Sequence, residues 1–551
     1  MGRIVRKTFY STTRFTVPAG ITRLRITGEN THRSKITVFS QMGRIIDKDG
    51  ALWAYGSNVA GELGTGNTTD NGSTPQLVVG GKKFTRVYTS LADSVFGGAY
   101  NYAIDENGDG YGWGSNNSIS PGTLGVGTVT TAYSSPVMIA GGKKWTQIYP
   151  LTGGRTYGID TQGQLWAWGL NGGTLPFPPF SVLPSQLGLG SDGDAVKSTP
   201  ALVVGGKKWK MMNGDSLGQT YGVDQDGNGW AWGNNSIVIS VDPDTFLSTV
   251  TGGALGTGSS NPAVFASTPM LISGGIKWKK ILGAQTMGDL LLGLGNPLAA
   301  GLSEDGKVYM WGGNIPDTDV VGLPHGNPAY SVPTLIEGQS NLKFSDFGVL
   351  TNGALSTFYG LTASGDLYLW GADSGSLLPG GVLVSSPTLL TGGLKFSKIF
   401  PRVFSPNFGG SGLVGLSLDG QMYSWGNNDR NSAGTGSPDY VSTPTLIQGG
   451  RRYVDVVIEV EADKGLAVDS DGNCWEWGAK FTGATGSTTA SSPIAVAGSH
   501  IVDVRNSPQE VIVLDVTPGS IVPIEMSGQY ASVNGTPFAR LPRTIVVEYE
   551  N

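Results

Sequence analysis

The stretch GQLWAWG occupies residues 163–169, and a near copy, GNGWAWG, occupies residues 227–233. The aromatic-glycine pair at the end of this motif occurs eight times, at intervals of 52 to 79 residues. Recurrence in a fixed order at a similar period is typical of folds built from one repeated unit. The motif is therefore expected to be a structural part of each unit. The eight copies are Tyr55-Gly56, Trp113-Gly114, Trp168-Gly169, Trp232-Gly233, Trp311-Gly312, Trp370-Gly371, Trp425-Gly426 and Trp477-Gly478.

A tight turn and a strand precede each aromatic-glycine pair. The segments IDTQGQLWAWG (159–169) and LSLDGQMYSWG (416–426) show a glycine-containing turn between two short hydrophobic runs, which is a strong β-hairpin signal. A glycine-rich loop such as GELGTG (61–66) follows the pair. Next come a proline, a Gly-Gly turn and an aromatic residue, as in TPALVVGGKKW (199–209). Each unit is therefore predicted to contain about four short strands.

All fourteen tryptophans fall into three positions of this repeat. Trp166 and Trp168 occupy two of these positions, and alternation along a strand places them on the same face. Their large rings are expected to fill the contact between neighbouring units. No tryptophan is left over for a ligand site.

A closed ring of such units is the expected architecture. A single four-stranded unit buries too little apolar surface to be stable alone, and a ring also protects the edge strands. We predict an all-β fold, a β-propeller of about eight four-stranded blades over residues 36–498, with seven blades and one displaced unit as the alternative. Lysine pairs are expected at edge strands, where charge discourages unwanted pairing; they are Lys82-Lys83, Lys143-Lys144 and Lys207-Lys208.

The ordered pattern G-x-L-W-x-W-G, then G-x-L-G-x-G, then proline, resembles the repeats of the regulator of chromosome condensation family. This resemblance covers about residues 36–498 and implies a propeller, commonly of seven blades. Family members usually carry Gly-x-x-His before the hairpin turn, where this chain has Arg155, Tyr157 or glycines instead. The resemblance therefore implies no nucleotide-exchange or chromatin-binding residue that can be assigned here.

Composition and charge exclude several kinds of site. Residues 1–35 carry a net charge of +7 and the rest of the chain −13, so no nucleic acid is expected on the propeller. The single cysteine, Cys474, allows no internal disulfide. His32, His325 and His500 lack the close spacing of zinc ligands. We therefore expect no catalytic residue, no cofactor and no metal.

Two aspartate-rich turns partly resemble calcium-binding loops. DENGDG (105–110) and DQDGNG (224–229) match the opening of that pattern, but Asn116 and Asn235 stand where a glutamate is required. Structural turns are the favoured interpretation, with weak calcium binding as the alternative. The GELGTG type of loop lacks the lysine of a phosphate-binding loop and is also interpreted as a turn.

Three insertions interrupt the repeat in three successive units, at residues 171–186, 234–253 and 313–331. All three follow the aromatic-glycine strand, so they are expected to emerge on one face of neighbouring blades. Irregular loops on a rigid scaffold are a usual place for recognition. Aromatic anchors for a protein or glycan are predicted here, and packing of each loop over its own blade is the alternative. The candidate residues are Phe177, Phe180, Phe246 and Tyr330.

The two ends of the chain lie outside the repeats. Residues 1–35 are expected to be a β attachment segment, with Arg14, Arg23 and Arg25 as candidate contacts. Residues 499–551 are expected to close the ring or to form a docking domain with the first segment. FTVPAGITRLRIT (15–27) resembles a β segment of phage tail and other virion surface proteins.

These observations together predict a non-enzymatic protein of a virus particle, such as a phage fibre, tail or capsid-decorating protein. Its ends would bind other virion proteins, and the loops within 171–331 would meet a host-surface protein or glycan. The start of the chain has no apolar run of a secretory signal and no segment could span a bilayer, so assembly in the host cytoplasm is expected. The first alternative is a soluble protein-binding propeller that acts as an inhibitor or adaptor. A glycan-cleaving enzyme is a further alternative.

Overall fold

The computed structural model describes most of the chain. The described residues are 4–9, 13–29, 36–39, 42–90, 99–116, 121–151, 153–172, 186–190, 194–214, 218–241, 248–284, 298–313, 322–323, 327, 329–352, 355–372, 377–378, 383–403, 411–428, 431–437, 440–458, 464–481, 487–496, 510–526, 531–534, 536–537 and 544–550.

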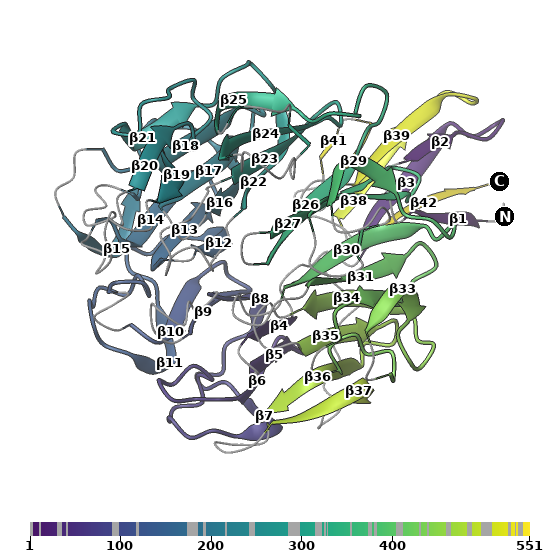
Figure 1. Ribbon diagram of the computed structural model, residues 1–551. Coiled ribbons are helices and arrows are strands. Elements are labelled where there is room, and N and C mark those ends of the chain that lie inside the picture. Colours follow the sequence, from purple (N-terminus) through teal and green to yellow (C-terminus); the bar gives the residue numbers. More distant parts are fainter. Residues whose placement is uncertain are drawn as a thin grey trace.

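Eight four-stranded antiparallel sheets follow one another along the described part of the chain, and each sheet is one blade (Figure 1). Blade 1 contains β4 (Ile36–Phe39), β5 (Met42–Ile46), β6 (Leu52–Gly56) and β7 (Gly72–Leu77). Blade 2 contains β8 (Phe84–Thr89), β9 (Tyr100–Asp105), β10 (Gly110–Gly114) and β11 (Tyr133–Met138). Blade 3 contains β12 (Trp145–Leu151), β13 (Arg155–Asp160), β14 (Leu165–Leu170) and β15 (Val196–Leu202). Blade 4 contains β16 (Trp209–Gly214), β17 (Gln219–Asp224), β18 (Gly229–Asn234) and β21 (Phe265–Leu271).

The remaining blades repeat this arrangement. Blade 5 contains β22 (Trp278–Ala284), β23 (Leu298–Ser303), β24 (Val308–Gly313) and β25 (Ala329–Leu335). Blade 6 contains β26 (Asp346–Asn352), β27 (Leu355–Leu361), β28 (Leu367–Ala372) and β29 (Leu383–Leu389). Blade 7 contains β30 (Phe396–Val403), β31 (Ser411–Ser417), β32 (Met422–Gly426) and β33 (Val441–Leu446). Blade 8 contains β34 (Tyr453–Ile458), β35 (Lys464–Asp469), β36 (Cys474–Phe481) and β37 (Ser487–Ala495).

The blades close into a ring. The first strand of each blade contacts the first strand of the next, and β34 of blade 8 contacts β4 of blade 1. The all-β propeller prediction is confirmed, with eight blades among the described residues.

The tryptophan of each aromatic-glycine pair packs between two blades. Trp168 is fully buried and donates a hydrogen bond of 2.8 Å from Nε1 to the carbonyl oxygen of Thr123, in the preceding blade. Gly125 of the same loop lies against this ring, since a Cβ atom there would lie 2.8 Å from Trp168 Nε1. The glycine-rich loop of one blade and the tryptophan of the next are therefore two halves of one contact. The same pairing occurs in Gly64 with Trp113, Gly188 with Trp232, Gly256 with Trp311 and Gly434 with Trp477.

This contact predicts that Gly125→Ala destabilises the propeller more than Gly141→Ala. Both glycines have a positive φ, 68° and 90°, so both substitutions carry backbone strain of roughly 1 kcal/mol. Only the methyl group at Gly125 meets a neighbour, because nothing lies within 4 Å of a Cβ at Gly141. We expect Gly125→Ala to cost about 1–3 kcal/mol beyond its control in urea unfolding. Equal losses would show that the contact with Trp168 is not tight.

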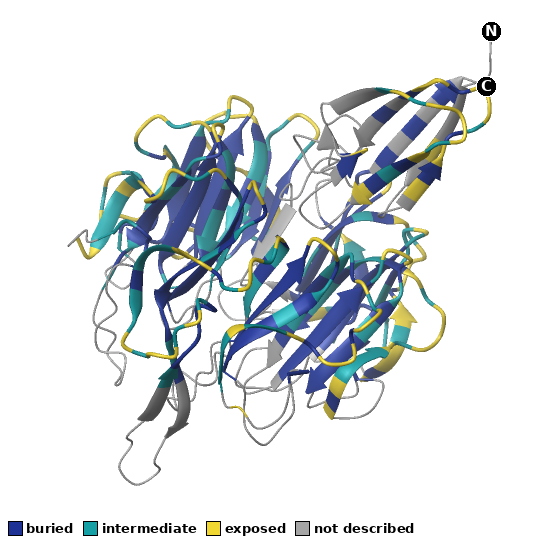
Figure 2. Cartoon of the chain, turned by 90° about the horizontal axis from the view of Figure 1, so that it is seen from above, coloured by how far each residue is buried: buried dark blue, intermediate teal, exposed yellow. Residues whose placement is uncertain are grey.

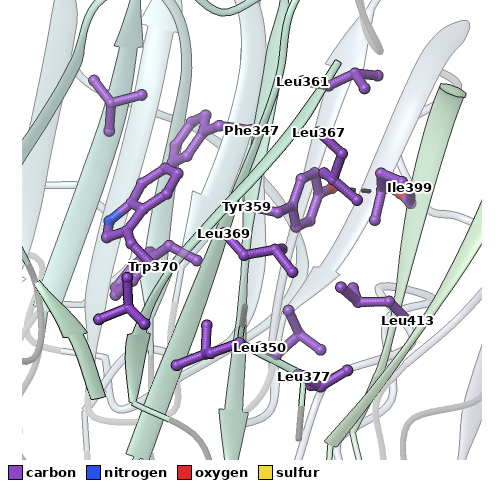
Figure 3. Packing of buried hydrophobic residues seen from close by; sticks show 14 of the residues in the cluster. Phe347, Leu350, Tyr359, Leu361, Leu367, Leu369, Trp370, Leu377, Ile399 and Leu413 are labelled. Carbon is purple, nitrogen blue, oxygen red and sulfur yellow. Dashed lines mark hydrogen bonds between the residues drawn. The ribbon is translucent and has the colours of Figure 1, made fainter. Parts of the chain in front are cut away.

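Aliphatic and aromatic residues fill the contacts elsewhere in the ring. Figure 3 shows the packing around blade 6, where Tyr359 of β27 and Leu369 of β28 lie toward Ile399 and Leu413 of blade 7. Trp370 of β28 lies on the other side of the blade, where a Cβ atom at Gly322 of blade 5 would lie 3.6 Å from its Cδ1. The hydroxyl of Tyr359 donates a hydrogen bond of 3.4 Å to the carbonyl oxygen of Ile399 in blade 7. Polar and apolar contacts therefore join the same pair of blades.

Strands from the two ends of the chain pair with each other and form what we call the terminal β unit (Figures 1 and 2). One sheet has the order β1 (Ile4–Phe9), β42 (Thr544–Glu550), β3 (Arg23–Glu29) and β38 (Glu510–Asp515). The other has the order β2 (Thr13–Thr16), β39 (Ile521–Met526), β40 (Ala531–Val533) and β41 (Thr536–Pro537). Among the described residues, their core is made of side chains from the two ends and includes Phe15, Leu24, Ile26, Val522 and Ile545.

Candidate functional site

The two faces of the ring differ in how their connections are built. Because neighbouring strands are antiparallel, the turns between second and third strands and the links to the next blade emerge together, on what we call the turn face. The connections between first and second and between third and fourth strands emerge on the opposite loop face.

Aspartates of the turn face are used within their own turns. Asp160 Oδ1 accepts hydrogen bonds of 2.9 Å from the backbone N–H groups of Gln162 and Gln164, and Oδ2 accepts one of 2.9 Å from Trp166 Nε1. A side chain that holds the backbone in this way stabilises a tight turn. The indole contact recurs between Asp47 and Trp53, Asp224 and Trp230, and Asp469 and Trp475.

The two calcium-like turns have the same structural arrangement. Asp105 Oδ1 accepts hydrogen bonds of 2.9 Å from the N–H groups of Asn107 and Asp109. Asn116 and Asn235, at the place of the missing glutamate, bind backbone carbonyls of their loops instead. Within the part of the chain that the structure describes, no group of three or more His, Cys, Asp or Glu side chains is placed to hold a metal ion.

The lysines in the links before blades 3 and 4 stack on aromatic rings. Lys143 Nζ lies 4.1 Å from the ring centroid of Trp166, and Lys207 Nζ lies 3.6 Å from that of Trp230. These side chains belong to the links between blades, so their assignment to edge strands was wrong. A cation over an indole is a stabilising contact of about 0.5–1 kcal/mol at a partly exposed site. The turn face is therefore a repeated, internally bonded surface.

An asparagine clamps the loops of the opposite face. Asn171 Oδ1 accepts a hydrogen bond of 3.1 Å from the N–H of Leu187, and its Nδ2 donates one of 3.0 Å to the carbonyl of Asp194. In the sequence this clamp corresponds to an asparagine two residues after the aromatic-glycine pair, a position whose role was not predicted from the repeat. The same residue acts at Asn58, Asn116, Asn235 and Asn428.

The three insertions all start from this clamped face, between the third and fourth strands of blades 3, 4 and 5. The insertion of blade 4 forms a two-stranded hairpin, β19 (Ser236–Val241) with β20 (Ser248–Gly252), which contacts β24 and β25 of blade 5. Ile237 is fully buried at the start of the hairpin. Neighbouring blades therefore carry the irregular segments, on one sector of one face.

The predicted anchor residues have different positions. Phe177, Phe180 and Phe246 lie outside the described residues. Tyr330 lies in β25 opposite Gly312, is half-buried and packs against the hydrophobic cores on both sides of its blade. Burial also raises the pKa of its hydroxyl. Tyr330 is thus part of the packing around blade 5, at the end of its insertion.

The predicted attachment arginines lie in the terminal β unit. Arg14 is exposed on β2, and Arg23 is exposed on β3, where its Nε lies 3.1 Å from Asp515 Oδ1. Arg25 lies between Val513 and Glu548 in the sheet register. An exposed ion pair of this kind contributes little to stability. Among the described residues, no helix is long and apolar enough to cross a membrane.

Comparisons with known proteins agree on the repeat. Residues 419–462 match the family model of the Regulator of chromosome condensation (RCC1) repeat. The E3 ubiquitin-protein ligase HERC2 of Mus musculus is 28% identical over 232 residues, which are 39% of this chain and 4% of HERC2. An RCC1 domain-containing protein of Dictyostelium discoideum is 44% identical over 77 residues, 14% of each chain. The matches thus span a small part of both relatives.

Solved structures are similar at low identity. Yeast RCC1 (Prp20), solved with Kap60 bound, is 18% identical with a TM-score of 0.47, and the match covers 78% of this chain and 92% of that one. Human WBSCR16 is 13% identical with a TM-score of 0.48, covering 74% and 98%. In its described part the chain is an eight-bladed β-propeller, and residues 419–462 are similar to the RCC1 repeat.

Proposed function

We propose that this chain is a non-enzymatic binding propeller whose loop face, over blades 3 to 5, recognises a protein partner. The observation that carries this proposal is that all three interruptions of the repeat emerge from the same connection of neighbouring blades. Asparagine clamps hold the first two insertions at their start. Variable segments on a rigid base are the usual arrangement of a recognition surface.

The structure of the turn face also favours the loop face as the recognition surface. Its aspartates bind their own turns, and its lysines stack on aromatic rings of the scaffold. Groups that are already bonded internally gain less from a partner, because each new contact replaces an existing one. The loop face is therefore the better candidate for specific recognition.

Deleting residues 173–185 tests the proposal. Asn171 and Gln186 are kept, because the first clamps the loop and the carbonyl of the second accepts a hydrogen bond from Tyr157. We expect partner binding to weaken at least about 30-fold, as for loss of a central anchor, with little change in the melting temperature. Proteins enriched by the full chain are compared with those enriched by the deletion, and the affinity of the differing partner is then measured with purified protein.

A turn-face variant, Lys207→Glu, is the matched control for this experiment. It replaces a side chain stacked on Trp230 and leaves the loop face intact. A partner retained by the control and lost by the deletion supports recognition through the loop face. Equal retention by both variants would contradict it.

The terminal β unit is proposed to attach the propeller to a larger assembly. Its strands come from both ends of the chain and its core is separate from those of the blades. That this assembly is a virus particle remains a prediction from the segment 15–27. An attachment role requires that unfolding this unit releases the protein while the propeller stays folded.

A further inference from the structure

The junction between blade 8 and blade 1, here called the seam, is the place where the ring closes. Blade 1 takes its four strands from residues 36–77 and blade 8 from residues 453–495, so no strand is shared across the seam. Side chains therefore make the direct contact between these two blades, while the terminal β unit pairs the segments that precede blade 1 and follow blade 8. The apolar cluster of the seam contains Ile45, Tyr55, Leu466, Val468, Cys474 and Val496.

A buried group of three polar side chains lies inside the seam. Lys464 Nζ lies 2.8 Å from Glu476 Oε2, and both residues belong to blade 8. The hydroxyl of Tyr55, from blade 1, donates a hydrogen bond of 2.9 Å to the same carboxylate oxygen. Lys464 Nζ also lies 4.7 Å from the centroid of the Tyr55 ring. The exposed fractions are 0% for Tyr55, 2% for Lys464 and 4% for Glu476.

The seam differs from the other seven junctions at two positions of the repeat. These are the aromatic residue of the aromatic-glycine pair in blade 1 and the residue before that pair in blade 8. Tyr55 is the one member of the aromatic-glycine series that is not a tryptophan. Glu476 precedes Trp477, and the residues in the equivalent position of the other blades carry no charge. They are Ala54, Gly112, Ala167, Ala231, Met310, Leu369 and Ser424.

Buried charge changes the energetics of opening. Separating two blades elsewhere exposes a tryptophan and its neighbours to water, and exposing apolar area is unfavourable at about 25 cal/mol per Å². Another junction also buries a charge, since Arg155 of blade 3 is fully buried and donates a hydrogen bond of 3.0 Å to Thr220 of blade 4. The seam instead buries a lysine–carboxylate pair. Separating blade 8 from blade 1 returns Lys464 and Glu476 to water, and recovered hydration offsets part of the lost contact. The loss of the Tyr55 hydrogen bond opposes this gain, because a bond to a charged acceptor is strong.

We propose that Tyr55, Glu476 and Lys464 form the lock that closes the ring, and that the propeller opens first at the seam when this lock is broken. Tyr55 is the part of the lock that crosses the seam. Without its hydroxyl, the carboxylate of Glu476 loses a buried donor and is better solvated in the open state.

Cys474 reports on this opening directly. It is the only cysteine of the chain, is 5% exposed and lies in the same cluster as Tyr55. In the closed seam the thiol is buried and an alkylating reagent cannot reach it. Burial also raises the pKa of this thiol, so less of it is the reactive thiolate. The rate of reaction with N-ethylmaleimide in native buffer therefore measures the open population.

The test compares Tyr55→Phe with Tyr157→Phe in the full chain. Both tyrosines are fully buried and each donates one hydrogen bond, Tyr157 to the carbonyl of Gln186 at 3.0 Å. We expect alkylation of Cys474 to accelerate about tenfold or more in Tyr55→Phe and to stay within about twofold of wild type in Tyr157→Phe. Equal acceleration in both variants, or none in either, would overturn the proposal.

A third variant tests the role of charge. The triple change Tyr55→Trp, Glu476→Ala and Lys464→Leu makes the seam resemble the other junctions. We expect alkylation no faster than in wild type and an equal or higher melting temperature, since replacing buried ion pairs by apolar residues is often stabilising. Fast alkylation of this variant in its folded form would show that the polar lock is not what closes the ring.

Discussion

Replacing Trp168 by alanine is expected to lower the free energy of unfolding by about 3–5 kcal/mol. The side chain is fully buried between blades 2 and 3 and packs against Tyr102 and Trp145, with ring centroids 6.0 and 5.5 Å away. Its loss leaves a cavity and removes the hydrogen bond to the carbonyl of Thr123. That carbonyl then lies buried with one donor fewer.

Trp166→Ala is the matched control, two residues away on the same strand. Trp166 is only half-buried, and its partners are Asp160 and Lys143 at the turn face. We expect a loss of about 1–2 kcal/mol, because less apolar area is removed and water can replace the lost hydrogen bond. Both variants are compared by urea unfolding followed by far-ultraviolet circular dichroism. A loss in Trp166→Ala as large as that in Trp168→Ala would contradict the assignment of Trp168 as the inter-blade residue.

Ile545→Asp is expected to unfold the terminal β unit and to leave the propeller folded. Ile545 is fully buried in a core made only of residues from the two ends of the chain. A carboxylate placed there has no partner and costs several kcal/mol, which is a large fraction of the stability of a unit of this size. The blades have their own cores, so their melting transition should shift little.

Two measurements check this result. Hydrogen exchange followed by mass spectrometry should show fast exchange in β3, β38 and β42 with protection retained in the blades. If the unit attaches the protein to a particle, the variant should also be lost from that particle. Ile521→Asp is the control, because Ile521 lies in the same unit but is 53% exposed. Exchange that spreads through the blades of Ile545→Asp would show that the two parts do not fold separately.

The repeat made the architecture predictable, because each position of the pattern has a local physical role. The tryptophan column predicted burial between blades, and Trp168 lies there. The positive φ of Gly125 also follows from its turn. That the same glycine lies against the tryptophan of the next blade could not be read from the pattern, since it depends on how blades are placed side by side.

Other features could be identified only from the three-dimensional structure. The Lys143 side chain was predicted to prevent unwanted pairing at an edge strand. Its position over Trp166 instead depends on the path of the link between blades. The seam joins Tyr55 to Glu476, which are 421 residues apart, and only closure of the ring brings them together. Departures such as Glu476 before Trp477 were visible in the sequence. Their meaning appears only when the last blade is known to meet the first.

The terminal β unit also sets an order of events during synthesis. Arg23 of β3 and its partner Asp515, the last residue of β38, are 492 residues apart. At about 5–20 residues per second the ribosome needs roughly half a minute to two minutes to make both. During that time the first three strands have no partner. Once the blades have closed into a ring, the two ends already lie close together. Pairing their strands then requires little further loss of chain entropy.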